Sequence, residues 1–100
     1  MATSLVKRPI IYKTYSGPSE NKSYTAGGTI GAILGSFAID ISQTGWTPVA
    51  VTLWLAPDID KCPAIIKMDS NATARVALYR GTNNAINITK DSITIRVAYI

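Results

Sequence analysis

Aromatic side chains are the residues of this chain whose type and spacing best suit a binding function. Trp46 and Trp54 lie in one apolar run at positions of the same parity, so strict alternation along a strand would place both on one face. Two indole rings on one face can stack against sugar rings, while neighbouring polar groups bind hydroxyls. The alternative is that both rings pack in the core or between subunits.

Three tyrosines form a second candidate contact surface. Tyr12, Tyr15 and Tyr24 lie near an amino-terminal turn cluster, with Lys13 and Lys22 beside them in the sequence. A solvated strand edge explains the same residues equally simply. The tyrosines therefore indicate either a binding surface or an ordinary exposed edge.

The residue types needed for most catalysis are missing. The chain has no histidine, which removes the usual general base and the commonest metal ligand, and its single thiol, Cys62, has no histidine to activate it. Asp58, Asp60 and Asp69 lack the oxygen-rich pattern of a calcium loop and are better explained as turn residues. We expect a protein that is not an enzyme and binds no metal or cofactor.

Charge and hydropathy argue against nucleic acid as a partner and against insertion into a membrane. The net charge is +4, but the ten lysines and arginines are scattered, with one adjacent pair at Lys7 and Arg8, so we expect no nucleic-acid binding. The longest weakly polar stretch, residues 25–39, contains four glycines and is shorter than the roughly 20 apolar residues of a membrane helix. The opening residues do not resemble a secretion signal.

Alternating residues predict an all-β domain. Residues 74–100 contain three short alternating runs separated by polar turn clusters, as expected of antiparallel strands. In the last run the residues that share one face are Ile93, Ile95, Val97 and Tyr99. The expected strands cover residues 30–41, 46–56, 64–68, 74–80, 85–89 and 93–100, with a short strand before the glycines at 27 and 28. This spacing predicts an antiparallel β-sandwich or jelly-roll-like body of seven to eight strands.

Two of these runs carry specific predictions about burial. The apolar residues of 30–41 also fit one face of a helix, but Gly31 and Gly35 disfavour a helix. As a strand, this segment would place on one face Ile33, Gly35, Phe37, Ile39 and Ile41. Residues 46–56 are apolar on both faces, which predicts a central strand buried on two sides.

Length and composition predict a single domain that assembles. One hundred residues fit one domain over residues 1–100, in which residues 1–16, with Pro9, form an edge strand or an extended arm against a neighbour. A hydrophobic share of 47% with 16% charged residues is apolar for so small a body. We expect another chain to cover some of this surface.

Two segments resemble the carboxyl-terminal β domains of bacteriophage and prophage tail proteins. In those domains a polar turn leads into an aromatic residue, a Thr-Pro pair and a β-branched strand, and the chain ends in alternating strands that close on an aromatic and an aliphatic residue. GWTPVAVTLW at residues 45–54 and ITIRVAYI at residues 93–100 are similar to this pattern, and the similarity spans roughly residues 25–100. The resemblance implies a small β-sandwich that forms a homotrimer at the distal part of a tail fibre or tail tip.

The function implied by the resemblance is that of a non-enzymatic virion component. Its partners would be copies of itself, other virion proteins and a host-surface glycan, and it would be soluble in the host cytoplasm before it joins the tail or surface of the virion. The chain begins with a methionine and lacks a preceding fibrous region, which suggests an independent small virion protein or an excised head domain. The alternatives are a capsid or tail decoration protein without receptor binding, and a free carbohydrate-binding module.

Overall fold

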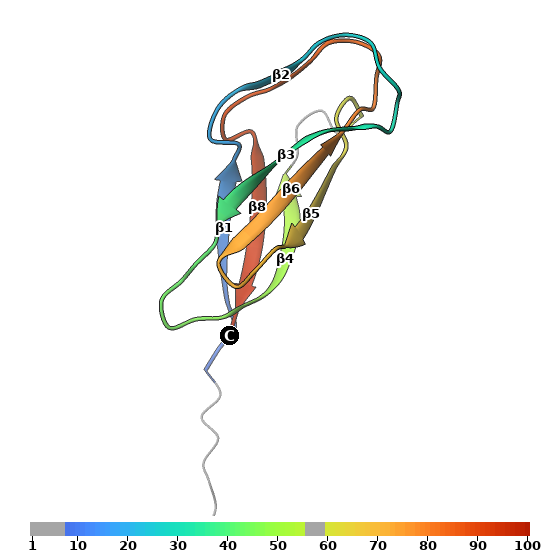
Figure 1. Ribbon diagram of the computed structural model, residues 1–100. Coiled ribbons are helices and arrows are strands. Elements are labelled where there is room, and N and C mark those ends of the chain that lie inside the picture. Colours follow the sequence, from blue (N-terminus) through green and yellow to red (C-terminus); the bar gives the residue numbers. More distant parts are fainter. Residues whose placement is uncertain (1–7, 56–59) are drawn as a thin grey trace, which may run out of the picture.

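The computed structural model describes residues 8–55 and 60–100, which form eight β-strands and no helix (Figure 1). The strands are β1 (Ile11–Gly17), β2 (Lys22–Tyr24), β3 (Ile33–Asp40), β4 (Pro48–Leu55), β5 (Ala64–Met68), β6 (Thr73–Tyr79), β7 (Ile86–Ile88) and β8 (Ile93–Tyr99). Within the described part of the chain, no helix long and apolar enough to cross a membrane is found.

The strands form two three-stranded antiparallel sheets and a short ribbon. One sheet has the order β1-β8-β4 and the other the order β3-β6-β5, while β2 and β7 pair beyond one end of both sheets (Figure 1). The two sheets pack face to face around a shared core. The prediction of an all-β, antiparallel, sandwich-like fold is confirmed.

The core is built by alternation in the two central strands. In β8 the buried residues are Ile93, Ile95, Val97 and Tyr99, as the sequence predicts. In β6 they are Ala74, Val76 and Leu78, and β3 adds Phe37 and Ile39. Neither central strand contains glycine, proline or a bulge, so every second side chain stays on the inner face.

The segment at residues 30–41 forms strand β3, so the helical alternative is wrong. A bulge between Ile33 and Gly35 interrupts its alternation, however. Phe37, Ile39 and Ile41 are buried as predicted, whereas Ile33 is 63% exposed. The prediction that Ile33 shares the inner face was wrong, because one extra residue moves every side chain before it to the other face.

Strand β4 is an edge strand of its sheet, not a central one. A bulge between Pro48 and Ala50 leaves Pro48 buried opposite Tyr99, whereas Ala50, Thr52 and Trp54 all face solvent. The predicted burial on two sides is therefore wrong for the single chain. Its outer face is open to another molecule.

Strand β1 forms the other edge of the same sheet and packs closely on the core. Ile11–Gly17 pairs with β8 along its whole length, and residues 1–7 lie outside the described residues. A Cβ atom at Gly17 would lie 2.5 Å from the ring of Phe37, closer than real carbon contacts allow. The end of β1 therefore requires glycine, because the aromatic ring of the opposite sheet occupies the side-chain position.

A chain of hydroxyl hydrogen bonds crosses the core at Tyr99. The Tyr99 hydroxyl donates to the carbonyl oxygen of Ile41 at 2.6 Å, so it accepts from the Tyr15 hydroxyl, 2.5 Å away. Gln43 Nε2 in turn donates to the Tyr15 hydroxyl at 3.3 Å. Burial first, and then the bond to Tyr15, raise the pKa of Tyr99 well above its usual value.

Arg80 is a buried arginine that hydrogen-bonds to the segments on either side of the β2-β7 ribbon. Arg80 is 6% exposed, and its guanidinium donates to the carbonyl oxygens of Thr25 at 2.8 Å, Thr82 at 3.0 Å and Asn84 at 3.1 Å. These oxygens belong to the segments that lead out of β2 and into β7. One side chain thus satisfies three carbonyl groups and ties the two segments together.

Candidate functional site

A shallow hollow opens on the outer face of the β1-β8-β4 sheet. Its volume is about 150 Å³, and its lining residues are Tyr12, Ala50, Thr52, Trp54, Arg96 and Ala98. Tyr12 comes from β1, Arg96 and Ala98 from β8, and the others from β4. All three strands of the sheet therefore contribute to one surface feature.

Strand register explains where the hollow lies. Ala98 of β8 pairs with both Tyr12 and Ala50, so two small side chains lie side by side next to a large one. On the next outward position of β8, Arg96 pairs with Thr52. The methyl groups of Ala50 and Ala98 make a low apolar floor, and the longer side chains around them make its walls.

A bulge in β4 sets the position of Trp54. Leu53 pairs with Ile95 and Leu55 pairs with Thr94, which leaves Trp54 as the extra residue between them. Bulges of this kind redirect a side chain while the strand continues. Trp54 is 52% exposed, so much of its indole surface is available for contact.

The guanidinium of Arg96 links the two aromatic walls. Its central carbon lies 4.3 Å from the ring centroid of Tyr12 and 4.7 Å from that of Trp54. Each cation–π contact at an exposed site contributes about 0.5–1 kcal/mol, so together they favour one arrangement of the three side chains. The hollow is therefore partly preorganised before anything binds.

Trp46 does not belong to this surface. It lies before β4, is half-buried and packs against the hydrophobic core. The guanidinium of Arg8 covers its ring at 3.7 Å and donates to the carbonyl oxygens of Gly45 and, at 3.2 Å, Ile100. The predicted shared face of Trp46 and Trp54 is wrong, because the bulge after Pro48 reverses the alternation between them.

The three tyrosines are not brought together either. Tyr12 lies on the outer face and is 55% exposed, whereas Tyr15 is half-buried against Tyr99 on the inner side of the same strand. Tyr24 lies in β2, away from both, and burial, followed by the nearby Cys62, raises its pKa. The prediction of a tyrosine surface was wrong because sequence neighbours of opposite parity point to opposite faces.

Arg96 lines the hollow, and sequence reasoning did not single it out as a candidate site residue. Alternation in the last strand already places it on the face opposite the core, with Thr94 and Ala98. Its aromatic neighbours come from strands far away in the sequence, however, and only the pairing register brings them beside it.

A second hollow lies on the outer face of the β3-β6-β5 sheet. It holds about 290 Å³ and is lined by Ile33, Ser36, Ile65, Lys67, Arg75, Ala77 and Tyr79. Ile33 and Ile65 are 63% and 59% exposed, so the two largest aliphatic side chains of this face project into solvent. Large aliphatic side chains are therefore exposed on a sheet face where polar side chains are expected in a monomer.

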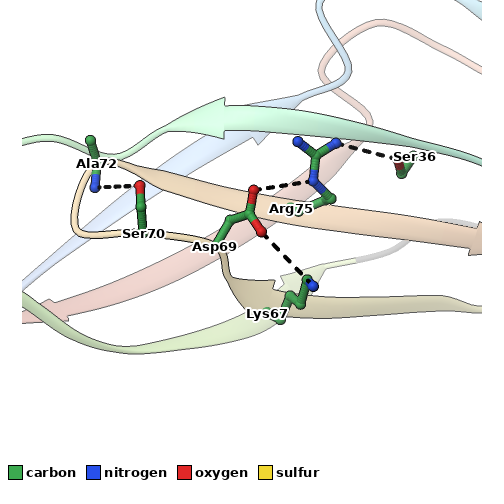
Figure 2. Close-up of polar contacts among 6 residues, drawn as sticks. All are labelled: Ser36, Lys67, Asp69, Ser70, Ala72 and Arg75. Atoms are coloured by element: carbon green, nitrogen blue, oxygen red, sulfur yellow. Dashed lines mark hydrogen bonds and ion pairs between the residues drawn. The ribbon is translucent and has the colours of Figure 1, made fainter.

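A small ionic cluster borders the second hollow. Figure 2 shows Asp69 between two cations, with Arg75 Nε at 3.4 Å and Lys67 Nζ at 3.9 Å from its carboxylate oxygens. Arg75 Nη1 also reaches the hydroxyl of Ser36 at 3.4 Å. Both signs of charge therefore lie on the rim of the hollow.

Of the aspartates considered as cation ligands, Asp69 has other partners in the structure. Asp69 is engaged by Lys67 and Arg75, and Asp58 lies outside the described residues. Over residues 8–55 and 60–100, no group of three or more histidine, cysteine or carboxylate side chains gathers in a way that could hold a metal ion.

Comparisons with known proteins add no further assignment. No family model, curated protein or solved structure matches this chain.

Proposed function

We propose that this protein is a non-enzymatic phage virion component, a tail-fibre or tail-tip head domain that attaches to a host-surface glycan. The observation that carries the proposal is the hollow in which Tyr12 and Trp54 flank Arg96 on an exposed sheet face. A sheet holds such a constellation more rigidly than a loop does. The resemblance of residues 45–54 and 93–100 to tail-protein domains supplies the setting.

The chemistry of the hollow suits a sugar. The indole of Trp54 offers an apolar surface for the face of a pyranose ring, while the Thr52 hydroxyl and the Arg96 guanidinium can hydrogen-bond to ring hydroxyls. Pockets for drug-sized ligands hold about 300–1,000 Å³, so a hollow of about 150 Å³ takes only one ring. A single site should therefore bind weakly.

Assembly would compensate for weak single sites. Three copies in one trimer would present three hollows to one polymer, and each further contact would form at a high effective concentration. This arrangement agrees with a host-attachment function, in which the ligand is a repeating surface glycan.

Replacing Trp54 tests the binding surface. We expect Trp54→Ala to weaken glycan binding at least tenfold, which corresponds to about 1.4 kcal/mol. The melting temperature should change little, because the ring is 52% exposed. A glycan array followed by titration calorimetry on the best ligand measures the first effect, and thermal denaturation measures the second.

The matched control is Leu55→Ala, which removes an exposed apolar side chain of the same strand outside the hollow. It should leave glycan binding unchanged. Unaltered binding by Trp54→Ala would contradict the proposed site. If the unmodified protein self-associates but binds no glycan, a decoration protein without receptor binding becomes the better assignment.

The outer face of the β3-β6-β5 sheet is the surface we assign to self-association. Ile33 and Ile65 would supply apolar contact, and the rim carries both Asp69 and the cations Lys67 and Arg75, so copies of the chain can match opposite charges. We expect a trimer by analytical ultracentrifugation at micromolar concentration. Ile65→Lys should shift the protein to monomer without unfolding it, and a wild-type protein that is only monomeric would contradict the assignment.

A further inference from the structure

We infer that the hollow selects an acidic sugar, with Arg96 binding a carboxylate or phosphate carried by the ring that stacks on Trp54. This inference rests on the proposed function and deepens it. It names a chemical class of ligand, and it assigns separate tasks to two side chains that line the same hollow.

The first argument is a comparison of the arginines. Arg75 is paired with the carboxylate of Asp69, and Arg80 donates to three carbonyl oxygens. Arg8 donates to the carbonyl oxygens of Gly45 and Ile100. The guanidinium of Arg96 contacts the rings of Tyr12 and Trp54, and no hydrogen bond or carboxylate partner from the described residues is present.

The second argument concerns the geometry of these contacts. Aromatic rings engage a guanidinium electrostatically through their π faces and do not use up its N–H donors. Rings on β1 and β4 hold the side chain of Arg96 from both sides of β8, so little rotamer freedom remains to be lost on binding. The planar guanidinium, held in this way, presents parallel N–H donors that match two oxygens of a carboxylate or a phosphate.

The third argument concerns the size of the hollow. Because about 150 Å³ admits a single ring, the anionic group and the stacked ring must belong to the same sugar unit or be directly bonded. The net charge of +4 would also attract an anionic polymer from a distance. The charge therefore favours a surface polysaccharide with acidic units over a neutral one, and the size requires the acid group to lie on or next to the stacked ring.

The test measures binding of the full chain to three oligosaccharides of equal length. One is a neutral oligoglucose, one is the corresponding oligoglucuronate, and one carries phosphate on its terminal hexose. Titration calorimetry at low salt is performed on the wild type, Arg96→Gln, Arg96→Lys and Lys90→Gln. Lys90→Gln removes one exposed positive charge outside both hollows and serves as the matched control.

We expect the wild type and Lys90→Gln to bind an acidic oligosaccharide at least tenfold more tightly than the neutral one. Arg96→Gln should lose this preference, because its affinity for the acidic probes should fall at least tenfold more than its affinity for the neutral one. Arg96→Lys should keep part of the preference, because the positive charge remains although the planar guanidinium is lost. The preference should shrink as salt rises, since the site is exposed. Whether glucuronate or the phosphorylated probe binds more tightly identifies the anionic group.

Two results would overturn the inference, and they are distinguishable from failure of the proposed function. A preference for acidic probes that survives in Arg96→Gln would show that another group recognises the anion. Equal binding of all three probes, lost in Trp54→Ala, would leave the sugar site in place without acid selectivity. If no probe, neutral or acidic, binds the wild type and a glycan array is also empty, the proposed glycan function itself fails.

Discussion

Arg80→Ala is expected to lower the free energy of unfolding by about 2–4 kcal/mol, the largest effect of any substitution considered for this protein. The side chain is 6% exposed and donates to the carbonyl oxygens of Thr25, Thr82 and Asn84. An alanine leaves these acceptors without their donor and opens a gap between the segments that lead to β2 and β7. Unpaired buried acceptors each cost about 1–3 kcal/mol, and entry of water into the exposed loops recovers part of that loss.

Urea denaturation measures the loss of stability, and amide hydrogen exchange locates it. Exchange should accelerate most at the amides of the β2-β7 ribbon, including Tyr24 and Ile86, and least in β8. Lys90→Ala is the control, because it removes a cation from an exposed pair with Asp91 and should change stability by less than about 0.5 kcal/mol. A loss of similar size in the control, or uniform acceleration of exchange, would refute the role assigned to Arg80.

Tyr99→Phe is expected to cost about 1–3 kcal/mol at neutral pH. The substitution keeps the buried ring but removes the donor to the carbonyl oxygen of Ile41 and the acceptor for the Tyr15 hydroxyl. The Ile41 carbonyl oxygen would then lose its hydroxyl donor, and the Tyr15 hydroxyl would lose its acceptor while it still accepts from Gln43. The ring itself remains fully buried, so no large cavity opens.

The same substitution should change the response to alkali. Burial raises the pKa of Tyr99 in the folded protein above the value of about 10 expected in the unfolded chain. Above that pH the folded state retains a proton that the unfolded state releases, so the free energy of unfolding falls as pH rises. Below about pH 10 the protonated Tyr99 hydroxyl makes its full contribution to the free energy of unfolding.

Urea denaturation between pH 7 and pH 11 tests the prediction. The difference in stability between the wild type and Tyr99→Phe should be constant up to about pH 10 and should shrink above it, because the variant lacks the titrating hydroxyl. Tyr12→Phe alters an exposed hydroxyl and serves as the comparison. A difference that stays constant to pH 11 would mean that the Tyr99 proton does not contribute to alkaline unfolding.

Alternation of apolar and polar residues predicted the buried face correctly in the strands that contain no bulge. β8 and β6 bury every second residue as expected, because neither strand contains a bulge; the extra residues lie in their partners β4 and β3. In residues 30–41 and 46–56 the strands were found, but the face was assigned wrongly for Ile33 and for Trp46, which lies before β4. A bulge adds one residue without any distinctive composition, so parity is lost at a point that the sequence does not mark.

The candidate site was predictable only in part. Trp54 and Tyr12 are among the candidate binding residues that the sequence indicates, and they line the hollow. Their position on either side of Arg96 depends on the register of β1 and β4 against β8, which long-range pairing decides. The buried role of Arg80 was also beyond the sequence, since its three acceptors are backbone oxygens, which every residue type supplies.

The central place of β8 has a consequence for biosynthesis. Strands β1 and β4 do not pair with each other in their sheet, and both depend on a strand that the ribosome makes long after them. During translation the edges of β1 and β4 that face β8 therefore stay without their partner until β8 is synthesised. The hollow lined by Tyr12, Trp54 and Arg96 therefore cannot form before β8, which supplies Arg96 and Ala98, has been synthesised.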